Sequence, residues 1–289
     1  MTAVLDEFRI DRVRPQREWG LLVINYLFLG GAGAGLVFVS LFVDSAWGEV
    51  AGLAALCLAT LFLFADLGRP ERFWRAFLRP STSWISRGAI LITSVVVLGA
   101  LHLLVVFSGV DAAPARTVLA VASGVAAAGV MAYTGFLLSP SPAIPFWNSA
   151  FFPTIFFAYS LLAGIDLLIL LSLAQPLAAG SLETLEEVQL GLGAGILLLL
   201  ASHLSVTANA GPAARESIAV LVRGAFRWTF FGGVFIVGLG VPVLASWAML
   251  ATGTAILASV AAALSVMRLV GDYLFRYLVI RAGHFDPPL

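Results

Sequence analysis

Five polar side chains interrupt long apolar stretches of this sequence and could take part in proton-coupled chemistry. Tyr26 and Tyr133 each carry a phenolic hydroxyl that can donate a hydrogen bond to a carbonyl oxygen. Asp66, Asp166 and His102 are titratable groups that can hold or pass on a proton. Two phenols with titratable neighbours could flank one ligand and supply it with protons.

Each of these residues also has a structural interpretation. Asp66 ends an apolar stretch, so it is either a capping or salt-bridged residue at the membrane interface or a proton acceptor at the mouth of a site. Asp166 lies near the middle of a stretch, where an unpaired carboxylate would cost roughly several kcal/mol, so it is either a proton relay or a protonated, hydrogen-bonded core residue. His102 has the same two interpretations. For Tyr26 and Tyr133 the competing role is that of interfacial belt residues.

The composition places these side chains in a membrane protein. Of the 289 residues, 61% are hydrophobic and 11% are charged, whereas a soluble domain has about 25% charged residues. The backbone amides in lipid must be paired internally, and the apolar stretches do not alternate as the strands of a barrel would. We therefore expect an all-α, polytopic integral membrane bundle with eight transmembrane helices, at 19–42, 49–65, 88–108, 117–139, 151–175, 188–208, 228–247 and 249–271.

These stretches also set the domain organisation and the depth of the phenols. We expect a polar N-terminal tail over 1–18, an eight-helix transmembrane domain over 19–280 and a C-terminal tail over 281–289. Tyr26 follows Trp19 by seven residues, and Tyr133 precedes Pro140 by seven residues. Both phenols therefore lie roughly 10 Å inside the same side of the membrane. Asn25 brings an amide to the same level.

The arginine residues predict the orientation. All 16 basic residues are arginine, and with eight spans every one except Arg116 falls on one side. We expect a multi-pass protein of the bacterial or archaeal cytoplasmic (inner) membrane. The positive-inside rule places the arginine-bearing side, with both termini, in the cytoplasm. Alternatively, the arginine residues mark the face where a partner docks, and the densest group is Arg69, Arg72, Arg75, Arg79 and Arg87.

The eighth stretch runs into three further charged residues. Arg268, Asp272 and Arg276 are spaced four apart, which puts them on one face of a helix. We expect this face to lie beyond the lipid, as a solvated extension or a docking surface.

Two loops on the arginine side are unusually apolar. The segment 140–150 has no charged residue and contains Trp147, and the segment that precedes Trp84 is similar. Such loops fold back against the ends of helices. We expect them to form an amphipathic pocket for a flat ligand with a long tail that enters from the lipid.

The sequence argues against several cofactors and partners. His102 and His203 differ in depth by roughly 13 Å, which excludes one haem held by both. The single cysteine cannot hold an iron–sulfur cluster, and we find no group with metal-ligand spacing, so we expect neither haem nor metal. There is no nucleotide-binding glycine motif, and we expect no nucleic-acid partner.

Several short motifs resemble those of a known family, the membrane anchors of the NrfD and polysulfide reductase type. The matching pieces are Glu18-Trp19 before the glycine-rich first stretch, Asp66-Leu67-Gly68-Arg69-Pro70 with Arg72-Phe73-Trp74, Ser83-Trp84-Ile85-Ser86-Arg87-Gly88, Tyr133-Thr134-Gly135 and Pro145-Phe146-Trp147-Asn148 with Pro153. They run in the family's order across the first five stretches. The last three stretches match only in number and hydrophobicity.

The resemblance implies a function. Family members lack redox cofactors of their own and bind a quinone, menaquinone or ubiquinone, beside an iron–sulfur subunit that leads to a catalytic subunit, often a molybdopterin enzyme. The positions that the resemblance implies for the quinone are Tyr26, Asp66 and Tyr133. From the polar first stretch and the apolar loops we add Asn25, Trp84 and Trp147 to the expected quinone site. The polysulfide reductase membrane subunit has histidine at or near the position of Tyr26, and a phenol there can also donate a hydrogen bond.

The sequence therefore predicts a membrane-anchoring, quinone-reactive subunit of a respiratory oxidoreductase complex. It has no catalytic residues apart from the quinone site, and proton translocation through Asp66, Asp166 and His102 is a possible extension. The relatives known best place the partner outside the cytoplasm, whereas the arginine residues favour a cytoplasmic partner here. The alternatives are a secondary transporter, although the halves show no convincing repeat, and a purely structural anchor.

Overall fold

The computed structural model describes residues 13–177, 180–253 and 257–286, and within them eight spans are long and apolar enough to cross a membrane. The predicted all-α membrane bundle with eight spans is confirmed. The spans are α2 (Leu21–Phe42), α3 (Ala46–Asp66), α4 (Trp84–Ser108), α5 (Ala113–Phe136), α6 (Phe151–Ser172), α7 (Ser181–Thr207), η2 (Thr229–Gly240) continued by α9 (Val241–Thr252), and α10 (Ala258–Arg281).

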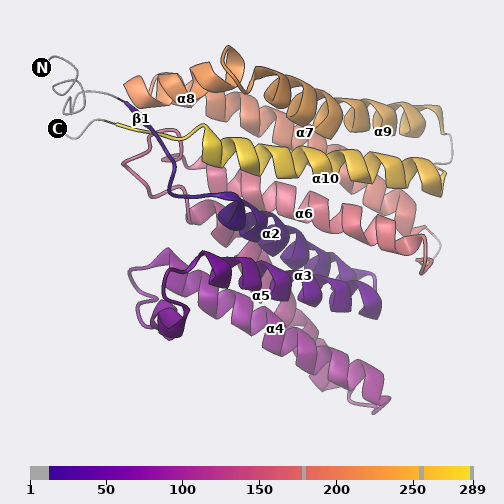
Figure 1. The fold of residues 1–289 in the computed structure, drawn as a ribbon. Coiled ribbons are helices and arrows are strands. Elements are labelled where there is room, and N and C mark those ends of the chain that lie inside the picture. The colour runs from indigo at the N-terminus through magenta and orange to yellow at the C-terminus, as the bar shows by residue number, and fades with distance from the viewer. Residues whose placement is uncertain (1–12, 178–179, 254–256, 287–289) are drawn as a thin grey trace, which may run out of the picture.

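The spans are arranged as two bundles that lie against each other (Figure 1). The first bundle contains α2, α3, α4 and α5, and the second contains α6, α7, η2–α9 and α10. Helix α2 joins them, because it packs against α3 and α5 and also against α6 and α10. At this junction a Cβ atom on Gly35 or Gly164 would collide with the backbone of the other helix. The glycine-rich run therefore serves close helix packing.

Local sequence explains where several spans begin and end. The Ser45 side chain accepts a hydrogen bond from the amide of Gly48 at the start of α3, and Ser83 caps α4 in the same way. Helix α4 ends at Gly109, whose φ of 67° suits a residue without a Cβ atom. These signals lie at the membrane surfaces, where the free amides and carbonyls of helix ends need partners.

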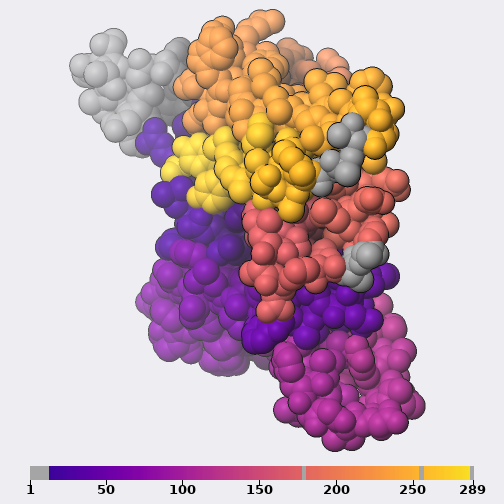
Figure 2. Space-filling view, turned by 90° about the vertical axis from the view of Figure 1, so that its right-hand side faces the viewer, coloured from indigo at the N-terminus to yellow at the C-terminus, as the bar shows by residue number. Residues whose placement is uncertain are grey.

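Both ends of the described residues lie at one face, which we call the arginine-rich face. Here β1 (Arg14–Pro15) pairs antiparallel with β2 (His284–Phe285), and η1 (Pro70–Phe77) and α8 (Pro212–Val222) lie at the same end of the bundles (Figure 1). At the opposite, arginine-poor face Arg116 pairs with Asp44 at 2.8 Å. Figure 2 looks onto this second face. The even number of crossings is confirmed. The predicted tail residues 1–12 and 287–289 lie outside the described part.

The seventh span is irregular. Its first half, η2, is a π-helix of 12 residues, and its second half, α9, is an α-helix with Pro242 in its first turn. Gly238 of η2 faces Gly271 of α10 so closely that a Cβ atom on either would collide with the other. Extended π-helix is rare and occurs often at functional sites.

The prediction for the eighth span was wrong. Helix α10 runs from Ala258 to Arg281, well past the predicted end at 271, and Arg268, Asp272 and Arg276 are buried inside it instead of lying beyond the lipid. Charged residues lower local hydropathy, which moved the predicted span toward the N-terminus. The bundle accommodates them because they are paired, as described below, and a paired charge costs far less to bury than a free one.

Candidate functional site

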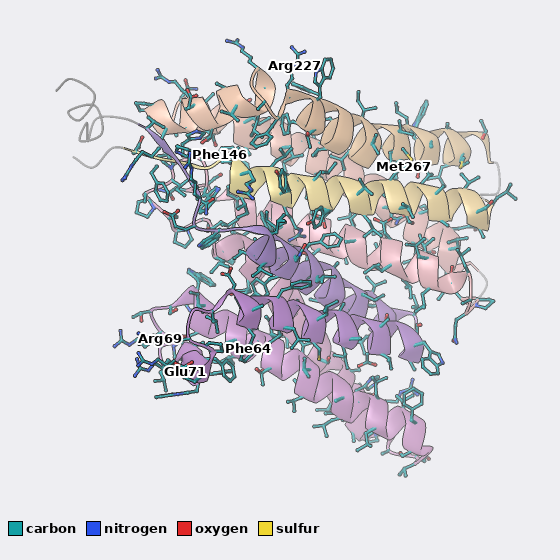
Figure 3. The ribbon with its side chains drawn as sticks, viewed as in Figure 1. Phe64, Arg69, Glu71, Phe146, Arg227 and Met267 are labelled. Carbon is teal, nitrogen blue, oxygen red and sulfur yellow. The ribbon has the colours of Figure 1, made fainter. Side chains whose placement is uncertain are left out.

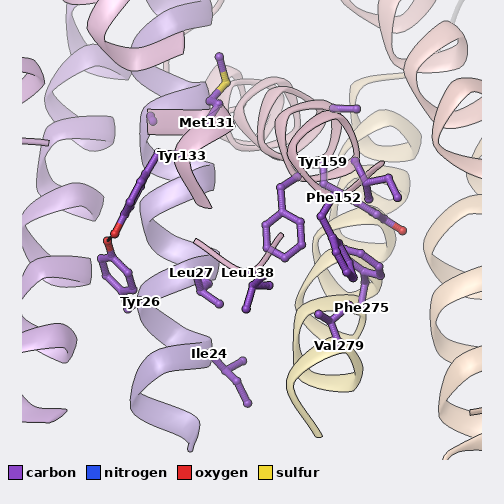
Figure 4. Close-up of a cluster of buried hydrophobic side chains, with 14 of the residues drawn as sticks. Ile24, Tyr26, Leu27, Met131, Tyr133, Leu138, Phe152, Tyr159, Phe275 and Val279 are labelled. Carbon is purple, nitrogen blue, oxygen red and sulfur yellow. Dashed lines mark hydrogen bonds between the residues drawn. The ribbon is translucent and has the colours of Figure 1, made fainter. Parts of the chain in front are cut away.

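The two phenols meet inside the first bundle. The hydroxyl of Tyr26 on α2 donates a hydrogen bond to the hydroxyl of Tyr133 on α5 at 3.1 Å, and both side chains are buried. Figure 4 shows the pair, separated by Leu27 and Leu138 from Tyr159 and Phe275 of the second bundle. The predicted approach of the two phenols is confirmed. Whichever hydroxyl donates, one phenolic hydrogen finds no acceptor among the described residues, so the pair can still donate to a ligand.

Helix α4 is shaped to receive Tyr133. A Cβ atom on Gly88 would collide with the Tyr133 ring, so the glycine provides the space for it. One turn earlier, the Trp84 ring stacks on Phe136 with centroids 4.4 Å apart. The guanidinium of Arg87 lies 4.3 Å from the centre of the Trp84 ring. Trp84 therefore belongs to the aromatic wall beside the phenols.

Asn25 and Trp147 face the last helix instead. The Asn25 side chain accepts a hydrogen bond from the hydroxyl of Tyr273 on α10 at 2.9 Å. The indole of Trp147 donates to the carbonyl of Val279 at 2.8 Å and packs against Trp19. Both side chains hold the arginine-rich end of α10 against the first bundle and the 137–150 loop. Neither forms a hydrogen bond with the two phenols, whose hydroxyls bond to each other.

Asp66 forms no hydrogen bond with the phenols. It is the last residue of α3 and is exposed, and its carboxylate forms no hydrogen bond with another described residue. The structure brings the two hydroxyls into contact, whereas no hydrogen bond links the Asp66 carboxylate to either of them. Helix α3 ends at Asp66, where the amide of Leu67 donates to the carbonyl of Phe64.

The arginine residues of the loop after α3 divide into two kinds. Arg69, Arg72, Arg75 and Arg79 are exposed on or beside η1, and Figure 3 shows Arg69 and Glu71 at the arginine-rich end of the first bundle. Arg87 is different, because its guanidinium donates to the carbonyls of Pro80 and Ser81, both at 2.8 Å, and so closes the loop.

Two buried polar groups of the first bundle lie near the arginine-poor face. The Nδ1 atom of His102 lies 2.8 Å from a carboxylate oxygen of Glu49, and both side chains are buried. Sequence reasoning selected His102 but missed Glu49, because Glu49 lies in the first turn of α3 and resembled an ordinary residue of a helix end. Between this pair and the phenols the core is apolar, with Leu53, Leu56, Val95, Val130 and Met131 all buried.

The second bundle holds a set of buried charges. One oxygen of Asp166 accepts hydrogen bonds from Arg268 and from Gln189, each at 2.7 Å. Arg276 is paired with Asp272 at 2.8 Å. Asp166 was among the predicted residues, but Gln189 and the nearby buried Glu186 were not. The i, i+4 spacing of charges on α10 was the signal that could have revealed this set.

His203 lies beside a small apolar cavity at the arginine-rich end of the second bundle. Its Nδ1 atom is 3.1 Å from the Ser149 hydroxyl, and its Nε2 atom has no hydrogen-bond partner among the described residues. The cavity, of about 10 Å³, is lined mainly by leucine and phenylalanine side chains. Within the described part of the protein, no three His, Cys, Asp or Glu residues are grouped so that they could hold a metal ion.

Comparisons with known proteins agree with this architecture. Residues 12–287 match the family described as polysulphide reductase, NrfD. The sequence is 28% identical over 305 aligned residues to the protein NrfD of Escherichia coli strain K12, covering 92% of this protein and 94% of that one. It is 26% identical over 267 residues to the C subunit of polysulfide reductase from Wolinella succinogenes, covering 80% of this protein and 83% of that one.

Proposed function

The chain belongs to the polysulphide reductase NrfD family, and from this premise we propose that it is the membrane-anchoring, quinone-reactive subunit of a respiratory oxidoreductase complex. The relatives support a membrane subunit, since one of them is named as a component of a reductase with several subunits. The observation that carries the quinone assignment is the hydrogen bond between the buried hydroxyls of Tyr26 and Tyr133.

The phenol pair suits a quinone because it is neutral, buried and able to donate. A quinone carbonyl accepts hydrogen bonds, and the corresponding quinol hydroxyl can donate one back. A carbonyl oxygen that enters between Tyr26 and Tyr133 replaces their mutual hydrogen bond, so neither phenol is left without a partner in an apolar interior. Trp84 and Phe136 supply a flat aromatic wall beside this point. Menaquinone and ubiquinone share these features.

A quinone needs two electrons and two protons to become a quinol, and we assign to this protein the movement of the protons. We assign electron transfer to an iron–sulfur partner subunit and, through it, to a catalytic subunit, such as a molybdopterin enzyme; the described residues hold no group of three or more His, Cys, Asp or Glu side chains suited to a metal ion. The exposed arginine residues around η1 (Arg69, Arg72, Arg75 and Arg79) form a surface that attracts an acidic partner.

Location and proton movement complete the proposal. The protein lies in the cytoplasmic (inner) membrane, with the arginine-rich face and both termini in the cytoplasm, as the excess of arginine there favours. Asp66 lies on the rim at the arginine-rich face and not against the quinone carbonyl. Asp166 is the candidate for moving protons through the second bundle, which makes the complex a proton translocator as well as a quinone reductase or quinol oxidase.

The test is quinone turnover by the complex that co-purifies with this protein in mild detergent, with menadiol as donor and ferricyanide as acceptor. We expect Tyr133→Phe to lower the rate at least about tenfold, because one donor to the carbonyl is lost. Tyr277→Phe, at a partly buried position of α10, is the matched control and keeps the rate. Unchanged turnover in Tyr133→Phe, with an intact complex, would leave only a structural anchor.

A further inference from the structure

The last helix carries three buried charges inside the membrane. Arg268, Asp272 and Arg276 follow one another at intervals of one turn on one face of α10, and all three are buried among neighbouring helices. Charges at this depth are costly, so such residues persist where they are paired and serve a purpose. Together with their hydrogen-bonding and charged partners they form a row of polar side chains, which we call the polar line.

One end of the line reaches the backbone of α2 one residue after Tyr26. Arg276 donates to the carbonyl of Leu27 at 2.9 Å, and Leu27 is the neighbour of Tyr26 on α2. Its guanidinium also donates to Asp272 and to the hydroxyl of Ser160 on α6. Gly31 of α2 provides the space, because a Cβ atom there would lie 2.9 Å from the guanidinium. The polar line therefore crosses from the second bundle to the helix that carries the proposed quinone ligand Tyr26.

The middle of the line is a closed triangle of side chains. Arg268 donates to Asp166 and to the side-chain oxygen of Gln189, each at 2.7 Å, and Gln189 donates in turn to Asp166. Only one oxygen of Asp166 takes part, and the other has no partner among the described residues. Asp272 lies within electrostatic range of Asp166. The free oxygen is a position at which Asp166 can take up a proton.

The other end of the line is Glu186, near the start of α7 at the arginine-poor face. Its side chain is 2% exposed, and neither carboxylate oxygen has a hydrogen-bond partner in the described structure. Glu186 lies one turn before Gln189 on the same face of α7 and interacts electrostatically with Arg268. An ionised carboxylate buried without partners is strongly unfavourable, so this group must carry a proton or exchange one with water.

We propose that Glu186 is the proton-exchange group of this subunit at the arginine-poor face, and that protons pass between it and the phenol pair through Asp166 and Asp272. This inference rests on the proposed quinone function. In the oxidation of one quinol, two electrons leave to the iron–sulfur partner and two protons leave the ring hydroxyls. The protons travel between the carboxyl groups, whereas Arg268 and Arg276 stay protonated and balance the negative charge left behind.

The first bundle offers a weaker route. Glu49 and His102 also lie near the arginine-poor face and are hydrogen bonded to each other. The stretch between them and the phenols is lined by buried aliphatic side chains, and among the described residues it holds none of the charged groups that the second bundle has. A proton has no carriers along that stretch. The geometry therefore assigns the path to the second bundle.

The experiment uses the complete complex in vesicles that enclose the pH dye pyranine, with the arginine-rich face outside. Menadiol is added as donor and ferricyanide outside as acceptor, and acidification of the lumen is measured for each menadiol oxidised. We expect Glu186→Gln to abolish lumen acidification and to slow menadiol oxidation, because the two ring protons lose their route, whereas Glu183→Gln should keep both rates. Glu183→Gln is the matched control, because Glu183 lies one turn earlier on α7 and is exposed.

The outcomes separate this inference from the proposed function. If Glu186→Gln acidifies the lumen as wild type does, or if wild-type vesicles never acidify although menadiol is oxidised, the inference fails and the quinone site stands. If Tyr133→Phe oxidises menadiol at the wild-type rate, the proposed function fails, and this inference fails with it. An infrared difference spectrum of the wild-type protein gives a second readout: a carboxylic C=O band that shifts in D₂O must vanish in Glu186→Gln and remain in Glu183→Gln.

Discussion

The two bundles differ in how they use polar groups inside the membrane. The first bundle places neutral hydroxyls, Tyr26 and Tyr133, near the arginine-rich face and keeps the core beneath them aliphatic. The second places full charges at several depths and pairs them, as with Arg268 and Asp166. Neutral donors suit a neutral ring, whereas paired charges suit the movement of protons. Under the proposed function, the two bundles of one helical scaffold separate ligand binding from proton transfer.

The strongest test of this contrast is the removal of a charge from the second bundle. Arg276→Met leaves Asp272 buried without its partner, so we expect the free energy of unfolding, measured in mixed micelles with SDS, to fall by about 3–5 kcal/mol. The double variant with Asp272→Asn should recover part of this loss. Arg116→Met breaks an exposed ion pair and should cost less than about 1 kcal/mol. Equal losses in Arg276→Met and Arg116→Met would contradict the contrast.

A smaller effect is expected from a methyl group added to the first bundle. In Gly88→Ala the new Cβ atom overlaps the Tyr133 ring, which must move out of hydrogen-bonding range of Tyr26. We expect menadiol oxidation to fall at least about tenfold, with a loss of stability of about 1–3 kcal/mol. Gly68→Ala, with open space around its Cβ position, is the control for turnover. Normal turnover in Gly88→Ala would show that the phenol pair is not needed.

The smallest effect is expected at the rim. Asp66 is exposed at the end of α3, and the phenol hydroxyls bond to each other and not to its carboxylate. We therefore expect Asp66→Asn to change menadiol oxidation by less than about twofold and to leave lumen acidification intact, because a water molecule can replace an exposed carboxylate. A loss of turnover as large as that in Tyr133→Phe would show that Asp66 acts at the quinone carbonyl and that the rim is part of the site.

Sequence reasoning predicted the spans well where hydropathy alone defines them. The starts and ends of the first five lie within a few residues of the observed helices, and the meeting of Tyr26 with Tyr133 followed from counting residues along two such spans. It failed for the eighth span. There, burial depends on partners such as Asp166, which precedes Arg268 by 102 positions, and a local pattern does not show which distant helix supplies a counter-charge.

The same limit explains the residues that were missed. Glu49 and Glu186 each lie in the first two turns of a span, where acidic side chains usually favour the helix dipole and face water. Their burial appears only when neighbouring helices cover them. The roles of Trp147 and Asn25 in holding α10 were equally invisible, because their partners, Val279 and Tyr273, lie at the other end of the sequence.

The order of the spans along the sequence has a consequence for biosynthesis. Helix α10 is the least hydrophobic of the eight spans and leaves the ribosome after the other seven. Arg268 can enter the bilayer at low cost only if Asp166 and Gln189 of the earlier helices are already in place to pair with it. Insertion of this span is therefore coupled to assembly of the preceding ones, and a truncated protein that lacks it would leave a lone buried acid for quality-control proteases to detect.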